Sequence, residues 1–210
     1  MRTLIGRRSA LAGSFLVLLA VGMPASGYAN SGQADSADEA IVAAIETGLN
    51  GIETLQAQFV QVDPEGYEST GRLAVARPGR YRAEYDNGRD LLIASGWTAT
   101  HYDLSNGQTR SVPASAVTFL RLLDTSDGSL SERFEIVNIG GDGDWGSVSL
   151  RGEGFDQTIV TLVAHLQPHF SLAGWTLYDP QTGDTTMHTL HEVQMNRTVS
   201  AENFATPEGF

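Results

Sequence analysis

The sequence predicts a mainly β protein with a few helices, arranged as an incomplete, half-open antiparallel β-barrel with a helical lid over an apolar cavity. About ten segments alternate between apolar and polar residues at a period of two, and turn residues separate them. Such a series is typical of a large curled antiparallel sheet or barrel. Only two longer segments have helical periodicity, and a short apolar helix in a β chain must lie on the open face of the sheet.

Residues 1–29 have the features of a secretory signal peptide. Three arginines precede an apolar run at 10–23, and the small residues Gly27 and Ala29 fit signal-peptidase cleavage before Asn30. An uncleaved anchor is the alternative, but this run is short for a membrane span and the later chain has no longer one. We therefore expect an exported protein.

The composition restricts both the compartment and the partners. The chain has no cysteine, so it folds without disulfides and cannot be acylated at a lipobox cysteine, which favours a soluble protein of the periplasm. All 13 basic residues are arginine, 25 residues are acidic, and the formal net charge is −12 at pH 7. Such a surface repels nucleic acid and anionic lipid headgroups, so we expect no nucleic-acid partner and no stable membrane insertion.

The first element after the signal peptide is expected to be a helix. Residues 30–37 are small and polar and predict a flexible lead-in, followed by a single domain at 38–210. Residues 36–39 match a capping box, and apolar residues then recur three or four positions apart from 41 to 52. The period changes to two at Leu55, where the first strand is expected.

A predicted hairpin at 71–85 contains an arginine in an unusual place. Alternation puts Arg77 on the same face as the apolar residues of the first strand, directly before a Pro-Gly turn. One interpretation is a strand-end arginine whose charged end reaches water. The other is a guanidinium directed into an apolar concavity, where it must find hydrogen-bond acceptors or destabilise the fold. The apolar and aromatic residues that the two strands place on one face are Leu73, Val75, Tyr81, Ala83 and Tyr85.

A second helical pattern follows the next strands of the sheet. Pro113 can open a helix that continues from 114 to 123, where apolar residues cover all but one polar line that includes Thr118. This helix is either an ordinary core helix or, together with the first one, a lid on the open face of the sheet. The predicted lid comprises residues 38–52 and 113–124.

Several short motifs occur in an order that resembles one known family. A strand ending Arg77-Pro78 is followed by a short turn and an aromatic-rich strand. The flanking segments that match are residues 55–61, Ser95-Gly96 with Tyr102-Asp103, residues 179–185 and residues 203–209. From about residue 40 to the C-terminus, the chain resembles the outer-membrane lipoprotein carrier (LolA-type) family of the Gram-negative periplasm. It departs from the family near Ala99 and Thr100, where bulky apolar residues are usual.

The resemblance implies a periplasmic chaperone that carries acylated lipoproteins and needs no reaction and no cofactor. It also implies that an inner-membrane ABC-type releasing complex supplies the cargo and that an outer-membrane receptor lipoprotein accepts it. Arg77 matches the cavity arginine of the family, and we expect it to latch the lid in the empty state. We further expect a monomer. The acyl-chain cavity is expected to be lined by Leu73, Val75, Tyr81, Tyr85, Phe119, Leu120 and Leu123.

Two other functions stay open for this sequence. A stationary lipid-binding or scaffold module of the envelope could use the same fold. An acyl-ester hydrolase would need a serine, a histidine and an aspartate to converge in space. The chain has no nucleophile elbow, phosphate loop or metalloprotease helix, so we expect no enzyme and no catalytic residue.

The histidines do not have the spacing of a metal site. Pro168 interrupts the strand between His165 and His169, and no cysteine completes a ligand set. His188 and His191 are an odd number of residues apart, so a strand directs them to opposite faces. We expect these histidines to lie on strand surfaces and expect no bound metal.

Overall fold

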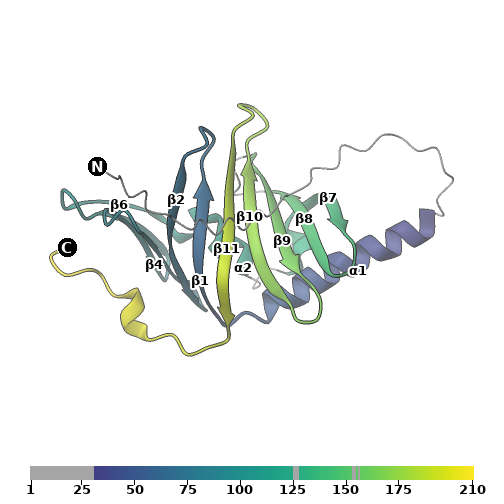
Figure 1. The fold of residues 1–210 in the computed structure, drawn as a ribbon, viewed down its shortest axis with the longest axis horizontal. Helices are drawn as coiled ribbons and strands as arrows, with labels where there is room; N and C mark the ends of the chain where they lie inside the picture. Colours follow the sequence, from purple (N-terminus) through teal and green to yellow (C-terminus); the bar gives the residue numbers. More distant parts are fainter. Residues whose placement is uncertain (1–30, 125–127, 153–154, 156) are drawn as a thin grey trace, which may run out of the picture. The chain divides into compact units, whose positions relative to one another are not determined.

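The computed structural model describes residues 31–124, 128–152, 155 and 157–210 (Figure 1). The expected signal peptide and its cleavage site lie outside these residues. Within the described part of the chain, no helix is both long enough and apolar enough to span a bilayer.

Eleven strands in the described residues form one antiparallel sheet (Figure 1). Their order across the sheet is β6-β5-β4-β3-β2-β1-β11-β10-β9-β8-β7. The strands are β1 (Thr54–Val62), β2 (Glu68–Ala76), β3 (Arg80–Tyr85), β4 (Asp90–Ser95), β5 (Thr98–Asp103), β6 (Gln108–Pro113), β7 (Glu135–Gly141), β8 (Trp145–Arg151), β9 (Ile159–His165), β10 (Ser171–Tyr178) and β11 (Thr185–Met195).

The two edge strands, β6 and β7, are consecutive in the chain but lie at opposite edges of the sheet. They do not pair with each other, so the sheet is open and does not close into a barrel. This confirms the half-open antiparallel architecture expected from the sequence. The first and last strands, β1 and β11, lie next to each other in the middle of the sheet. Their pairing runs from Leu55 opposite Met195 to Val62 opposite Met187.

Among the described residues between the two edge strands, three short segments are helical: η1 (Ala114–Ala116), α2 (Thr118–Leu123) and α3 (Leu130–Arg133). The single helix expected at 113–124 is therefore wrong, because β6 includes Pro113 and the helical path breaks at Val117. Val117 is extended, with φ −86° and ψ 103°, a conformation that suits a β-branched side chain. A capping box of Ser129 and Glu132 opens α3, and its Ser-x-x-Glu pattern is the signal by which the sequence could have indicated this helix.

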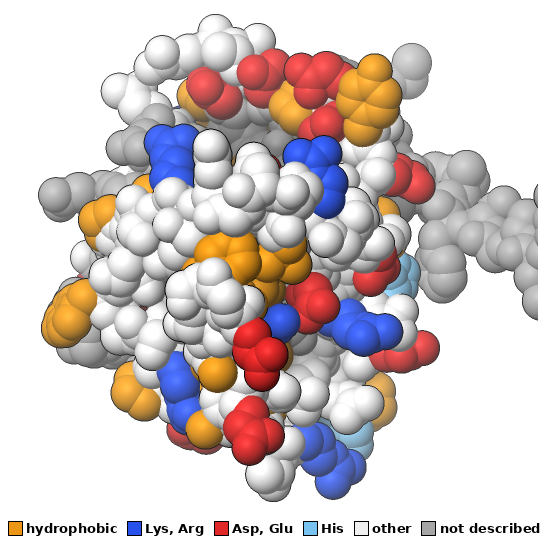
Figure 2. All heavy atoms as spheres, turned by 90° about the vertical axis from the view of Figure 1, so that its left-hand side faces the viewer, with side chains coloured by type: hydrophobic (Ala, Val, Ile, Leu, Met, Phe, Trp, Pro, Cys, Tyr) orange, Lys and Arg blue, Asp and Glu red, His pale blue; other side chains and the backbone are white. Residues whose placement is uncertain are grey.

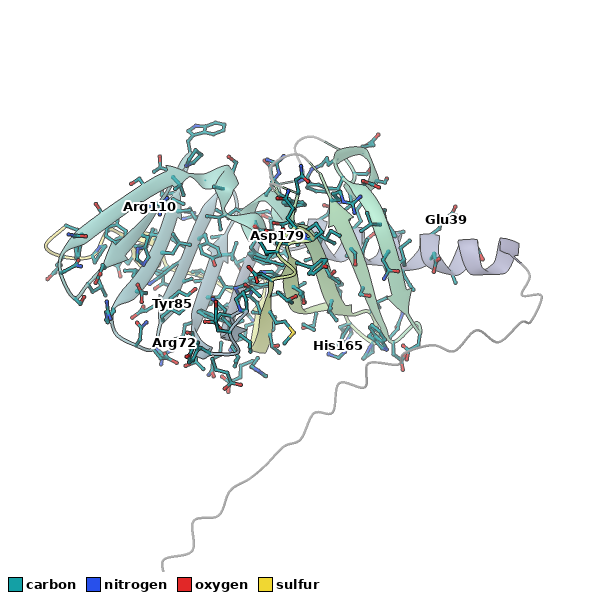
Figure 3. The ribbon with its side chains drawn as sticks, turned by 90° about the horizontal axis from the view of Figure 1, so that it is seen from above. Glu39, Arg72, Tyr85, Arg110, His165 and Asp179 are labelled. Carbon is teal, nitrogen blue, oxygen red and sulfur yellow. The ribbon has the colours of Figure 1, made fainter. Side chains whose placement is uncertain are left out.

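The N-terminal helix α1 (Ser31–Asn50) packs against β7 and β8. It begins before the start expected at residue 38, so most of the expected flexible lead-in is helical, because adding turns to a docked helix costs little free energy. Figures 1 and 3 show its N-terminal end, which carries Glu39, extending beyond β7. Glycines allow close packing of the remainder: a β-carbon at Gly48 would overlap the ring of Phe170.

The face of the sheet that carries Leu73 and Val75, called the inner face below, holds the main core. This core contains apolar residues of α1 and α2 and buried residues from both halves of the sheet, which are strands β1–β6 and strands β7–β11. The opposite, outer face has a smaller cluster of Leu91, Ile93 and Tyr102. The C-terminal segment lies over that face, since the ring of Phe210 meets Tyr102 edge-on at 5.2 Å.

On the side of the molecule shown in Figure 2, acidic and arginine side chains are interspersed with small apolar groups.

Candidate functional site

Arg77 links the end of β2 to the end of α1. Its backbone N–H donates to the carbonyl of Glu53, 2.9 Å away. Its guanidinium Nη2 donates to the carbonyl of Leu49 at 3.0 Å, and Nη1 donates to that of Asn50 at 3.2 Å. The last carbonyls of a helix have no partner within the helix and carry partial negative charge, so a cation at this position is favourable.

The surroundings of Arg77 place it between the ends of two helices. Burial lowers the pKa of its guanidinium, while the carboxylates of Glu53 and Asp124 act in the opposite direction. Glu53 follows α1 and Asp124 directly follows α2. Arginine stays protonated in proteins, so its charge has to be satisfied in every state of the site. Its Nε is buried without a hydrogen-bond partner among the described residues, which leaves this cation only partly satisfied.

The other expected cavity residues meet in one apolar cluster. Leu73, Val75, Tyr81, Phe119 and Leu123 are buried there. Tyr85 and Leu120 are half-buried and pack against the same cluster. Side chains of the helical segments therefore pack against the inner face.

An aromatic stack that the sequence pattern did not predict connects α2 to the sheet. The ring of Phe119 lies on that of Trp175 in β10, with centroids 4.7 Å apart and planes at 21°. Trp175 stacks in turn on His188 in β11, at 4.6 Å and 15°. A bulge between Leu172 and Gly174 shifts the alternation in β10, so simple parity could not assign the face of Trp175.

His188 is not a surface histidine, so that expectation is wrong for this position. It lies opposite Trp175 in the sheet register and shares the inner face with it. Burial lowers the pKa of His188 to about 4, so the imidazole is neutral near pH 7. Its Nδ1 is buried and has no hydrogen-bond partner among the described residues.

A hydrogen bond between side chains of β3 and β1 also lies on the inner face. The hydroxyl of Tyr85 donates to Oε1 of Gln61 at 2.8 Å. The Tyr85 ring meets Phe59 edge-on, with centroids 5.1 Å apart, across the position of Gly71. A β-carbon at Gly71 would come within 2.6 Å of the Phe59 ring, so the absence of a side chain there allows the two rings to meet.

The chain matches known proteins in sequence and in fold. A sequence model of the family described as outer membrane lipoprotein carrier protein LolA matches residues 50–207. The chain belongs to this family. An outer-membrane lipoprotein carrier protein of Coxiella burnetii (strain RSA 331 / Henzerling II) is 32% identical to it over 98 residues. That match covers 42% of this chain and 46% of the relative, so the chain spans about half the length of the curated relative it matches.

Two solved structures extend the comparison. An uncharacterized conserved protein from Thermus thermophilus has a TM-score of 0.51 at 14% identity, covering 83% of this chain and 96% of that chain, and shows the shared fold. A LolA superfamily protein from Nitrosomonas europaea has a TM-score of 0.43 at 10% identity, covering 80% of this chain and 97% of that chain.

Membership of the LolA family confirms the resemblance found in the sequence, and the family is described as a carrier of lipoproteins and not by a reaction. The described residues contain no group of three or more histidine, cysteine, aspartate or glutamate side chains placed to hold a metal ion. What they do contain is an apolar face, a helix end held by a cation and a few neutral polar groups.

Proposed function

We propose that this protein carries acylated lipoproteins through the periplasm and holds their acyl chains against the inner face until a receptor accepts them. The observation that carries the proposal is the pair of hydrogen bonds from Arg77 to the carbonyls of Leu49 and Asn50. They hold the end of a helix whose apolar side chains belong to the inner core. Such a cover can move while the hydrogen-bonded sheet beneath it stays intact.

A carrier is needed because an acyl chain is costly to expose. Each methylene transferred out of water is worth about 0.8 kcal/mol, so a long chain exposed in water costs on the order of 10 kcal/mol. In the closed form, side chains of α1 and α2 occupy the inner face. Acyl chains that displace them would bury comparable apolar surface, and the process requires no bond making or breaking in the cargo.

Arg77 serves in this proposal as the latch of the empty state. Its two bonds to helix carbonyls contribute about 1–2 kcal/mol each once partial exposure is considered. Cargo that displaces the end of α1 breaks them and leaves the guanidinium near an apolar cavity without those acceptors. The loaded form is then strained, which favours release to an acceptor with greater affinity.

The proposed partners follow from the direction of transport. An inner-membrane ABC-type releasing complex supplies the lipoprotein, and an outer-membrane receptor lipoprotein takes it. The signal-peptide features of residues 1–29, the absence of cysteine and the net charge of −12 support a soluble monomeric carrier of the periplasm.

Transfer from purified carrier to purified receptor tests this function. We expect Arg77→Leu to load an acylated lipoprotein as well as the wild type does and to pass it on much more slowly. Arg80→Leu and Arg82→Leu are matched controls on the outer face, where Arg80 lies 5.3 Å from the centroid of the Phe204 ring and Arg82 pairs with Glu84 at 2.8 Å.

Three results would contradict the proposal. Normal transfer by Arg77→Leu combined with slow transfer by either control would show that the latch is an arginine on the outer face of the hairpin and not Arg77. A wild-type protein that loads cargo but never releases it would instead be a stationary lipid-binding module, and release of free fatty acid with time would indicate a hydrolase.

A further inference from the structure

The inner face is not uniformly apolar. Gln61 of β1 lies opposite Ser69 of β2 and opposite His188 of β11 in the sheet register. Residues paired in this way share a face, so these three side chains form one row across three neighbouring strands, here called the polar row. The next row of the same face is apolar and consists of Gly71, Phe59 and Leu190.

His188 contributes an unused hydrogen-bonding atom to the polar row. Its ring is fixed by stacking on Trp175, and Nδ1 is buried with no partner among the described residues. Buried polar atoms of native proteins almost always have partners, and an exception calls for an explanation. A neutral imidazole can carry its proton on Nδ1 and donate it.

Gln61 contributes a second donor. Its Oε1 accepts the hydrogen bond of the Tyr85 hydroxyl, which fixes the orientation of the amide and directs the NH2 group elsewhere. No described residue accepts a hydrogen bond from that NH2 group. Gln61 and His188, which are paired across β1 and β11, therefore each place a neutral donor group on the inner face.

We propose that the polar row binds the carbonyl oxygens at the head of the cargo's acyl chains, with Nδ1–H of His188 and the amide NH2 of Gln61 as donors. These carbonyls belong to the ester and amide groups that join acyl chains to a lipoprotein. The inference rests on the proposed function and adds to it the part of the lipid that the protein recognises.

The charge of the polar row selects this type of acceptor. Ser69, Gln61 and neutral His188 carry no positive charge, so the row suits a neutral carbonyl oxygen and not the phosphate of a phospholipid headgroup.

The length of the inner face agrees with this placement of the carbonyl groups. From Gln61 back to Thr54, beside the Arg77 latch, β1 extends roughly 23 Å at about 3.3 Å per residue, on the scale of a long acyl chain.

Two synthetic lipopeptides of identical peptide sequence test the inference. One carries two palmitoyl chains in ester linkage, and the other carries two hexadecyl chains in ether linkage and therefore lacks the ester carbonyls. We expect the wild type to bind the ester form about five- to tenfold more tightly, the effect of one or two net hydrogen bonds. Fluorescence titration with the purified protein measures both dissociation constants.

His188→Phe keeps an aromatic ring for stacking but removes Nδ1. We expect it to bind the ether form as the wild type does and to lose the preference for the ester. His191→Phe is the matched control, because His191 lies on the same strand but pairs with Gln58 on the outer face. Gln61→Leu provides a second variant and is expected to reduce the preference in part.

The outcomes separate this inference from the proposed function. An ester preference that survives in both His188→Phe and Gln61→Leu, or that His191→Phe abolishes equally, overturns the role of the polar row. Equal binding of both lipopeptides by the wild type also overturns it but leaves the carrier function intact. Failure of the wild type to bind either lipopeptide refutes the carrier function, and the inference with it.

Discussion

The ring of Phe119 lies flat against that of Trp175, with centroids 4.7 Å apart and planes at 21°. This contact joins the short helix α2 to strand β10 across the inner face. An offset stack of two buried aromatic rings contributes beyond the apolar area that it buries. Phe119 is therefore one of the residues that attach α2 to the sheet, together with the buried Leu122 and Leu123.

Removing this contact should loosen the lid. Phe119→Ala is expected to lower the free energy of unfolding by about 3–4 kcal/mol, the usual cost of truncating a buried phenylalanine. It should also increase binding of the dye ANS to the empty protein, because apolar surface becomes accessible. Leu120→Ala, at a half-buried position on the same helix, should have a smaller effect on both measurements. Chemical denaturation and dye fluorescence test the pair, and equal effects would contradict this role of Phe119.

A charge at the same position should interfere with cargo. Phe119→Asp directs a carboxylate into the apolar cluster, whereas Thr118→Asp places it at a half-buried neighbour. We expect binding of an acylated peptide to weaken at least tenfold more in Phe119→Asp than in Thr118→Asp. Displacement of ANS by the peptide measures the affinity of each variant. Equal losses would show that α2 does not cover the binding face in this way.

Acid should destabilise the protein through His188. Burial lowers the pKa of His188 to about 4, below the usual value of 6.5, so the unfolded chain takes up the proton first as the pH falls. The resulting loss of stability begins near pH 6.5, reaches about 3 kcal/mol near pH 4 and then levels off. The groups that face His188, Trp175 and Gln61, are uncharged and do not compensate.

The contribution of His188 can be isolated by substitution, because carboxylates also titrate in this range. The difference in unfolding free energy between wild type and His188→Phe should grow in favour of the variant from pH 7 to pH 4. His191→Phe should follow the wild type throughout. Urea denaturation at several pH values provides these differences, and a constant difference for His188→Phe would argue against a buried neutral imidazole.

The docking of α1 depends on the absence of a side chain at Gly48. A β-carbon there would overlap the ring of Phe170, so Gly48→Val should weaken the attachment of the helix by about 1–3 kcal/mol. Gly51→Ala is the control, because its β-carbon would meet backbone oxygens at an ordinary 3.5 Å. Hydrogen exchange of the α1 amides reports the difference. Adding Phe170→Ala to the Gly48→Val variant should partly restore the attachment of α1. If it does not, the new side chain at position 48 overlaps with a residue other than Phe170.

Export provides a further prediction. The small residues at 27 and 29 and the absence of cysteine lead us to expect a mature protein that begins near Asn30 and is released with the soluble periplasmic fraction. N-terminal sequencing of that fraction tests this expectation. An intact N-terminus that stays in salt-washed membranes would show that residues 1–29 act as an anchor.

Sequence periodicity was sufficient for features that follow regular alternation. It predicted the open antiparallel sheet and the common face of Leu73 and Val75, because β2 alternates regularly as far as Ala76. It failed where the backbone departs from regularity, at the bulge before Trp175 and at the extended Val117. It also could not detect the burial of His188, because that burial comes from a ring on a neighbouring strand.

The central pairing of β1 with β11 determines when this protein can fold. One half of the sheet, from β1 to β6, precedes the other half in the chain, and the ladder between β1 and β11 is what unites them. Contacts between residues so distant in sequence form slowly, because a long loop must close first. The last strand has to be synthesised before the middle of the sheet exists. A chain that stops before Thr185 would leave two half-sheets with exposed edges, a form prone to aggregation.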